Sequence, residues 1–143
     1  MLKAVLFDMD GVIVDTEPLH HKAYQMMFKD FNLKVSESMY RGFTGQSTRS
    51  ICEFLCRHYM LETKPIDLEI TKRDHFTRLF FEDPDLHLID GVEELIKNYY
   101  NNGLTLIVAS SASMFTINNV MKRFRLDTYF KDKLSGADLK ASK

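Results

Sequence analysis

Apolar positions along the chain fall into short runs and longer stretches with helical spacing. Residues 2–7 and 104–109 are largely apolar without regular polar alternation, which is typical of strands covered on both faces of a parallel sheet. Residues 91–100 and 113–124 repeat apolar side chains at helical intervals. A further short strand is expected near residues 133–136. This alternation predicts an α/β fold with a doubly wound parallel sheet.

A long stretch between the first strand and the next helix, residues 16–84, contains no convincing strand pattern. Residues 17–31, 47–61 and 67–81 carry apolar side chains at helical spacing, and Ser47 or Thr48 can cap the second of these. Three or four amphipathic helices with short connections predict a small all-α bundle. We therefore expect a core of residues 1–15 and 85–143 with an inserted helical domain of residues 16–84.

Charge and composition narrow the function classes. The 143 residues include 19 basic and 20 acidic side chains, for a net charge of -1. No strong overall field would attract nucleic acid or an anionic membrane, so neither is an expected partner. A stretch long enough for a secretory signal or a transmembrane helix is not expected, because charges interrupt the first apolar run. A cytoplasmic location is the resulting expectation.

The two cysteines, Cys52 and Cys56, are four residues apart and share one helix face. This spacing differs from Cys-x-x-Cys, and no second ligand pair accompanies it. We expect two reduced, packed thiols and no zinc or redox site.

Two carboxylates follow the first predicted strand. Asp8 and Asp10 are two residues apart at its C-terminal end, which is the usual ligand edge of a parallel sheet. If the strand continued that far, both carboxylates would face the same side. Gly11 then allows a tight backbone turn. One carboxylate could attack phosphorus while its neighbour protonates the leaving oxygen.

A carboxylate that attacks a phosphate dianion meets like-charge repulsion. At about 4 Å and an effective dielectric constant near 20, each pair of unit charges costs roughly 4 kcal/mol. A cation is therefore expected at such a site, and the oxygen ligands favour Mg²⁺.

Three other interpretations of this pair of aspartates stay open at this point. Asp8-Met9-Asp10-Gly11 could be no more than a turn. A pair of glycosidase carboxylates usually comes from different elements and straddles a sugar. A phosphoacceptor of the receiver type would place its aspartate at the end of a later strand, whereas the strand at residues 104–109 leads into Ser110.

A longer stretch, Val5-Leu6-Phe7-Asp8-Met9-Asp10-Gly11-Val12-Ile13-Val14-Asp15-Thr16-Glu17-Pro18-Leu19-His20, resembles the haloacid dehalogenase superfamily. Within the superfamily it is most similar to the branch of β-phosphoglucomutases and sugar-phosphate phosphatases with a helical cap. The resemblance covers the whole chain and implies a Rossmann-like core with a cap at residues 16–84.

The resemblance implies roles for six residues of the core. Asp8 would be the nucleophile that becomes an aspartyl-phosphate and a Mg²⁺ ligand. Asp10 would be the general acid and base and would lend its backbone carbonyl to the metal. Ser110, followed by Ser111, would hydrogen-bond the transferring phosphoryl group, with Gly11 beside it, and Lys143 would neutralise charge. Alone, Ser110 could equally be a turn residue at a strand end, and a solvated terminal lysine is the alternative for Lys143.

The chain departs from the family pattern after Lys143. In relatives this lysine is followed by proline, a helix and a strand ending in an acidic pair that completes the Mg²⁺ shell. We therefore expect this chain to be part of a longer protein, with slow turnover or none by itself. A first strand left at the edge of the sheet is an association hazard, so a homodimer through that edge is one expected arrangement.

The resemblance also points to four residues of the cap. His20 corresponds to a cap histidine near the reacting groups, and Lys72 to a substrate-contacting lysine; a packing histidine and a solvated lysine are the alternatives. Gly45 and Arg49 lie in the stretch that corresponds to the specificity loop. The mutase pattern there has an arginine followed by a serine three residues later, whereas Arg49 is followed by Cys52.

The function implied is a Mg²⁺-dependent phosphatase that acts on a small phosphorylated sugar or metabolite. A β-phosphoglucomutase is the near alternative, since both share the aspartyl-phosphate and differ in the acceptor of the phosphoryl group. An inactive phosphate-binding or scaffold protein is the alternative from another class.

Overall fold

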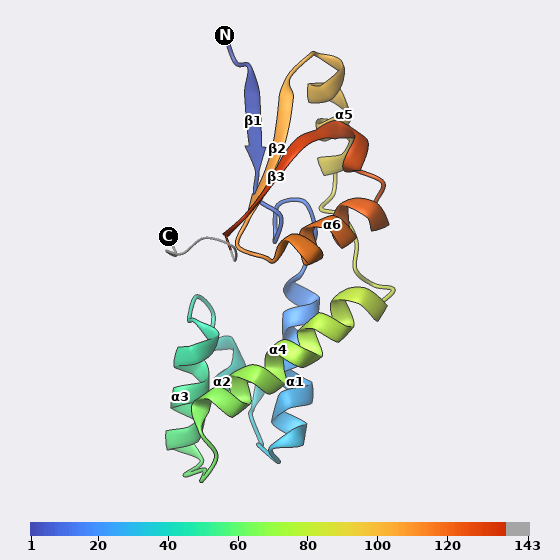
Figure 1. The fold of residues 1–143 in the computed structure, drawn as a ribbon. Coiled ribbons are helices and arrows are strands. Elements are labelled where there is room, and N and C mark those ends of the chain that lie inside the picture. The colour runs from blue at the N-terminus through green and yellow to red at the C-terminus, as the bar shows by residue number, and fades with distance from the viewer. Residues whose placement is uncertain (137–143) are drawn as a thin grey trace. The chain divides into compact units, whose positions relative to one another are not determined.

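The computed structural model describes residues 1–136 and divides into two compact units. Met1–Glu17 and Asp85–Lys143 make up the first unit, and Pro18–Pro84 the second, which begins at Pro18 rather than at the expected residue 16. That these units act as a catalytic core and a cap stays a prediction. The elements, labelled in Figure 1, are β1 (Ala4–Phe7), α1 (Glu17–Asp30), α2 (Glu37–Arg41), α3 (Thr48–His58), α4 (Pro65–Glu82), α5 (Val92–Asn101), β2 (Thr105–Ser110), α6 (Met114–Arg123), a 3-10 turn (Asp127–Tyr129) and β3 (Phe130–Ser135).

The first unit is built on a parallel sheet with the strand order β1-β2-β3. Phe7 of β1 is paired with Val108 of β2, and Ser110 of β2 with Ser135 of β3. Both crossovers step in the same direction, and right-handed crossovers of this kind place their helices, α5 and α6, on one face of the sheet. The expected α/β architecture with a parallel sheet is confirmed. The described strands form the half of a doubly wound sheet in which successive strands are added in one direction.

The two faces of this sheet differ in burial. On one face, Phe7, Leu106 and Val108 are buried, in line with the packing of α5 against β2 and of α6 against β3. On the opposite face, the side chains of Leu6 and Leu134 are 62% and 50% exposed. Within residues 1–136 the sheet is therefore covered on one face, although its strands have the apolar character of a sheet covered on both.

Two element boundaries differ from the sequence prediction. Strand β3 begins at Phe130, three residues before the expected start at residue 133, because its polar residues still pair with β2. Helix α4 begins at Pro65 rather than at residue 67. Proline suits the first helical position, because the N–H group that it lacks would have no hydrogen-bond partner within the helix there.

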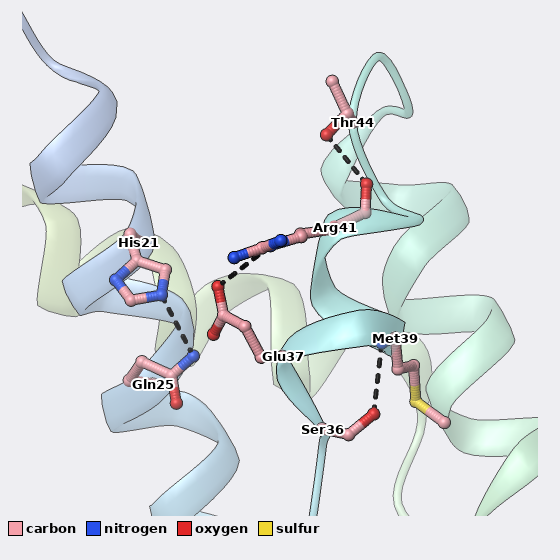
Figure 2. Close-up of polar contacts among 7 residues, drawn as sticks. All are labelled: His21, Gln25, Ser36, Glu37, Met39, Arg41 and Thr44. Atoms are coloured by element: carbon pink, nitrogen blue, oxygen red, sulfur yellow. Dashed lines mark hydrogen bonds and ion pairs between the residues drawn. The ribbon is translucent and has the colours of Figure 1, made fainter.

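The second unit consists of α1 to α4 around an apolar core, as the helical spacing predicts. Serine side chains cap two of its helices: Ser47 Oγ accepts from Ser50 N at α3, and Ser36 Oγ accepts from Met39 N at α2 (Figure 2). Of the described helices, none has the length and apolar character needed to cross a membrane. The core residues of this unit are Tyr24, Met27, Phe28, Leu33, Phe43, Ile51, Cys52, Leu55, Cys56 and Leu68.

Candidate active site

The carboxyl ends of the three parallel strands meet at one edge of the sheet. Asp8 directly follows β1, Ser110 is the last residue of β2, and Ser135 is the last residue of β3. The pairing of Phe7 with Val108 and of Ser110 with Ser135 keeps these ends level with one another. This is the edge at which open α/β sheets bind their ligands.

Strand β1 ends at Phe7, so the condition under which strand geometry would align Asp8 and Asp10 is not met. Asp8 instead turns one carboxylate oxygen back to the next residue, where Oδ1 accepts from Met9 N at 2.7 Å. The side chain of Met9 is fully buried between the two exposed aspartates. The buried Met9 side chain anchors the turn, while the residues Asp8 and Asp10 on either side of it are exposed.

A compact turn follows the aspartates. The Met9 carbonyl accepts from the N–H groups of residues 12–14 at 3.3, 2.9 and 3.1 Å. Gly11 lies in the left-handed region with φ of 72°, which an L side chain would strain. The Gly11 N–H donates to Val14 O at 2.8 Å, so Gly11 shapes the turn with an amide that is already hydrogen-bonded.

The segment after β2 is held by two serines. Ser110 Oγ accepts from Ala112 N at 3.1 Å, and Ser135 Oγ donates to Ala112 O at 2.6 Å. Ser110 and Ser135 are both buried. Gly136 packs so closely that a Cβ there would lie 3.1 Å from Ser111 Cα. The loop after β2 is thus fixed from β3 as well as from its own strand.

Ser135 and Gly136 lie at the same edge of the sheet, and the sequence analysis did not single them out as candidate site residues. The sequence indicated their position only indirectly: a strand predicted at residues 133–136 of a parallel sheet must end beside Ser110. Lys143, predicted to approach the phosphoryl group, lies outside the described residues.

In the second unit the structure brings together two of the four predicted cap residues. Lys72 Nζ lies 2.8 Å from His20 Nδ1, and the Lys72 side chain is buried. This burial contradicts the alternative of a solvated helix lysine. A neutral His20 prevails near neutral pH, because burial and then Lys72 lower its pKa from 6.5 to about 4.

The other two predicted cap residues lie around the start of α3. Gly45 adopts φ of 80° in the turn before the helix. Arg49 is exposed, and its Nε donates to Glu53 Oε1 at 3.2 Å, one helical turn along. Figure 2 shows the preceding segment, where Arg41 pairs with Glu37 and Thr44 Oγ1 donates to the Arg41 carbonyl. Nothing in these contacts commits Arg49 to a ligand.

The described residues contain no group of three or more His, Cys, Asp or Glu side chains that could hold a metal ion. Asp8 and Asp10 offer carboxylate and carbonyl oxygens at the sheet edge. Mg²⁺ prefers oxygen ligands and commonly retains several waters while one or two carboxylates bind it. The oxygens present therefore fit a hydrated Mg²⁺ ion.

Comparison with known proteins extends these observations. The chain is 29% identical to a phosphorylated carbohydrates phosphatase from Thermotoga maritima, over 99% of this chain and 65% of that protein. It is 28% identical to 6-phosphogluconate phosphatase from Escherichia coli, over 96% of this chain and 61% of that protein. The chain thus spans less than two thirds of the length of these two relatives.

A solved structure agrees with the fold. The crystal structure of a Thermotoga maritima protein, described provisionally as a β-phosphoglucomutase, superposes with a TM-score of 0.79 at 26% identity, over 99% of this chain and 65% of that chain. The family model of the haloacid dehalogenase-like hydrolases matches residues 5–143. That match includes both aspartates, the loop after β2 and the whole second unit, and the chain therefore belongs to the haloacid dehalogenase-like hydrolase family.

Proposed function

We propose that this chain belongs to a phosphatase that hydrolyses a small phosphorylated sugar or a similar metabolite through an aspartyl-phosphate on Asp8. The observation that carries the proposal is the position of Asp8, exposed at the carboxyl end of β1 and level with the end of β2 at Ser110. The two similar phosphatases, which by their names act on phosphorylated carbohydrates and on 6-phosphogluconate, support the substrate class.

The reaction would proceed in two displacements. An Asp8 carboxylate oxygen attacks phosphorus, the bond from phosphorus to the leaving oxygen breaks, and Asp10 gives that oxygen its proton. Water then attacks the aspartyl-phosphate while the Asp10 carboxylate accepts a proton. Inorganic phosphate leaves, and both aspartates return to their starting state.

Ser110 suits the role of a donor to the phosphoryl group. Its Oγ already accepts a hydrogen bond from Ala112 N, so the hydroxyl proton is left to donate to an oxygen of the substrate. Ser111 would line the same loop, and Lys143 would neutralise charge on the phosphoryl oxygens.

Mg²⁺ is part of the proposal, with the Asp8 carboxylate and the Asp10 carbonyl as its protein ligands. The bound ion would reduce the repulsion of about 4 kcal/mol between each pair of like charges at about 4 Å. A small phosphorylated metabolite as the partner and a cytoplasmic location complete the proposal.

A direct test follows the phosphoryl group on the protein. The chain is incubated with Mg²⁺ and acetyl phosphate, quenched in acid and mapped by peptide mass spectrometry. We expect a phosphoryl adduct on Asp8 that Asp8→Asn abolishes. Asp10→Asn should keep the adduct and slow its loss, because acetyl phosphate has a good leaving group and needs little acid assistance. Equal phosphoryl labelling of the unaltered chain and of Asp8→Asn would refute the mechanism.

A β-phosphoglucomutase is the second candidate, favoured by the similarity to the Thermotoga maritima structure described in that way. A mutase returns the phosphoryl group to a sugar hydroxyl, whereas a phosphatase gives it to water. Incubation with β-glucose 1-phosphate separates them, because free phosphate marks the phosphatase and glucose 6-phosphate the mutase. Arg49, followed by Cys52 rather than serine, favours the phosphatase.

A further inference from the structure

A buried positive charge lies inside the helical unit, formed by Pro18–Pro84, next to a histidine. Lys72 of α4 is 5% exposed, and its Nζ is 2.8 Å from Nδ1 of His20 on α1. The His20 ring stacks on Phe76, with 4.2 Å between ring centroids and 17° between ring planes. The stacking and the hydrogen bond together fix the orientation of the imidazole.

The surroundings of Lys72 favour its charged form. Its Nζ lies 4.9 Å from the ring centroid of Tyr24 and 5.1 Å from that of Phe76. Two aromatic faces at these distances stabilise an ammonium ion, and more strongly where water is excluded. Two titratable groups, His20 of α1 and Cys52 of α3, lie close enough to interact electrostatically with Lys72.

The hydrogen bond then decides the tautomer of His20. An ammonium group has donors and no acceptor, so Nδ1 of His20 must accept and cannot carry a proton. In a neutral imidazole the proton then resides on Nε2. We infer that Lys72 is a positioning residue, whose buried charge holds His20 as a neutral imidazole with its proton on Nε2.

The protonation equilibrium of His20 agrees with this geometry. Burial is the main cause, and Lys72 the second, of a His20 pKa lowered from 6.5 to about 4. The unfolded chain therefore binds more protons than the folded chain between these two pH values. Stability that depends on neutral His20 is complete above about pH 6.5 and declines as the pH falls towards 4.

The tautomer gives His20 and Lys72 different roles toward a ligand. This assignment of roles rests on the proposed function. A Lys72 ammonium that is buried against two aromatic rings does not serve as an exposed phosphate anchor. His20 acts on a ligand through Nε2–H as a hydrogen-bond donor, and it does not carry protons near neutral pH. Donation without charge suits a sugar hydroxyl or a phosphoryl oxygen.

Nuclear magnetic resonance can test the inference on the 143-residue chain without any turnover. Long-range ¹H–¹⁵N correlation of ¹⁵N-histidine-labelled protein distinguishes the two tautomers, and His20→Gln identifies the His20 signals among the five histidines. We expect the Nε2–H tautomer at pH 7, unchanged down to about pH 5. An Nδ1–H tautomer, or titration of His20 between pH 6 and 7, would overturn the inference.

Two variants separate a positioning role from a purely structural one. Lys72→Met removes the charge and keeps much of the apolar stem, so it should produce a mixture of tautomers and a higher His20 pKa. Lys72→Arg retains a cationic donor and should restore the Nε2–H tautomer. Asp8→Asn, which removes the proposed nucleophile, should leave the His20 signals unchanged. If Lys72→Met does not fold, the unaltered chain alone decides the question.

Discussion

Ser110 and Ser135, paired across β2 and β3, hold opposite ends of the same residue. Ser110 Oγ accepts from Ala112 N at 3.1 Å, while Ser135 Oγ donates to Ala112 O at 2.6 Å. A loop clamped in this way keeps the Ser110 hydroxyl in place without using its proton. Preorganised donors of this kind are effective in catalysis because they need no reorientation during the reaction.

Ser135→Ala should loosen this loop. Loss of the donor leaves the Ala112 carbonyl without that partner in a partly buried position, which costs about 1–2 kcal/mol of unfolding free energy. Under the proposed function, binding of inorganic phosphate, measured by calorimetric titration with Mg²⁺, should also weaken. Ser36→Ala is the matched control: it removes a helix cap from the other unit, costs about 1 kcal/mol and should leave phosphate binding unaltered. Equal effects on phosphate binding would contradict the prediction.

Gly136→Ala should disturb the same loop by crowding. The added Cβ would lie 3.1 Å from Ser111 Cα and 3.3 Å from Ser110 O, so the backbone must shift. Overpacking of this kind costs about 1–3 kcal/mol. Gly103→Ala serves as a control, since its Cβ meets nothing within 4 Å and any cost comes from its φ of 77°. Both variants should lower the melting temperature, and only Gly136→Ala should weaken phosphate binding. A normal phosphate affinity for Gly136→Ala would show that the close packing of Gly136 against Ser111 does not matter for phosphate binding.

Local sequence patterns predict most of the elements, whereas the burial of individual side chains depends on tertiary packing. Helical spacing and serine caps are local signals, and α3 starts after Ser47 as expected. Strand β1 ends at Phe7 and the Met9 side chain is fully buried, and no local sequence pattern reveals that burial. Burial of Lys72 likewise depends on rings from two different helices, those of Tyr24 and Phe76, which meet only in the folded unit.

An ion pair between a partly exposed lysine and a buried carboxylate joins α1 to the C-cap of α4. Lys22 Nζ donates to Asp83 Oδ2 at 2.6 Å, with side chains 40% and 5% exposed. Lys22→Met leaves the buried Asp83 carboxylate without this partner and should lower the free energy of unfolding, measured in urea, by about 1–2 kcal/mol. The loss is smaller than for a fully buried ion pair, because Lys22 is partly hydrated. Lys97→Met breaks the exposed pair with Glu93 and should cause no measurable change. Similar losses in both variants would show that burial of Asp83 is unimportant.

Within residues 1–136 one face of the sheet is uncovered, and this face should make the chain associate with itself. Leu6 and Leu134 are 62% and 50% exposed on a face of the kind that parallel sheets normally cover. Sedimentation should show concentration-dependent dimers. Leu6→Ser with Leu134→Ser should weaken them about tenfold or more, since a buried leucine contributes on the order of 1.5–3 kcal/mol. Ile66→Ser, at a 50% exposed position on α4, is the control and should change nothing. Dimers that persist in the double variant would place the interface elsewhere, for instance at the edge of β1.

The thiol of Cys52 should be inert in the folded chain and should couple stability to high pH. Burial, and then Glu69, raise its pKa from 9.0 to about 12. The thiolate fraction at pH 8 is therefore about a thousandfold smaller than in the unfolded chain, and iodoacetamide should modify Cys52 only after unfolding. The Cys52 thiol loses its proton above pH 9.0 in the unfolded chain and only near pH 12 in the folded chain, so stability should fall as the pH rises from 9.0 towards 12.

Cys52→Ala should flatten this part of the stability profile. The variant should also be less stable at every pH, because removal of the fully buried thiol leaves a small cavity. Rapid alkylation of Cys52 in folded protein would contradict the prediction, since a reactive thiolate requires a polar, accessible surrounding that the core of this unit does not provide.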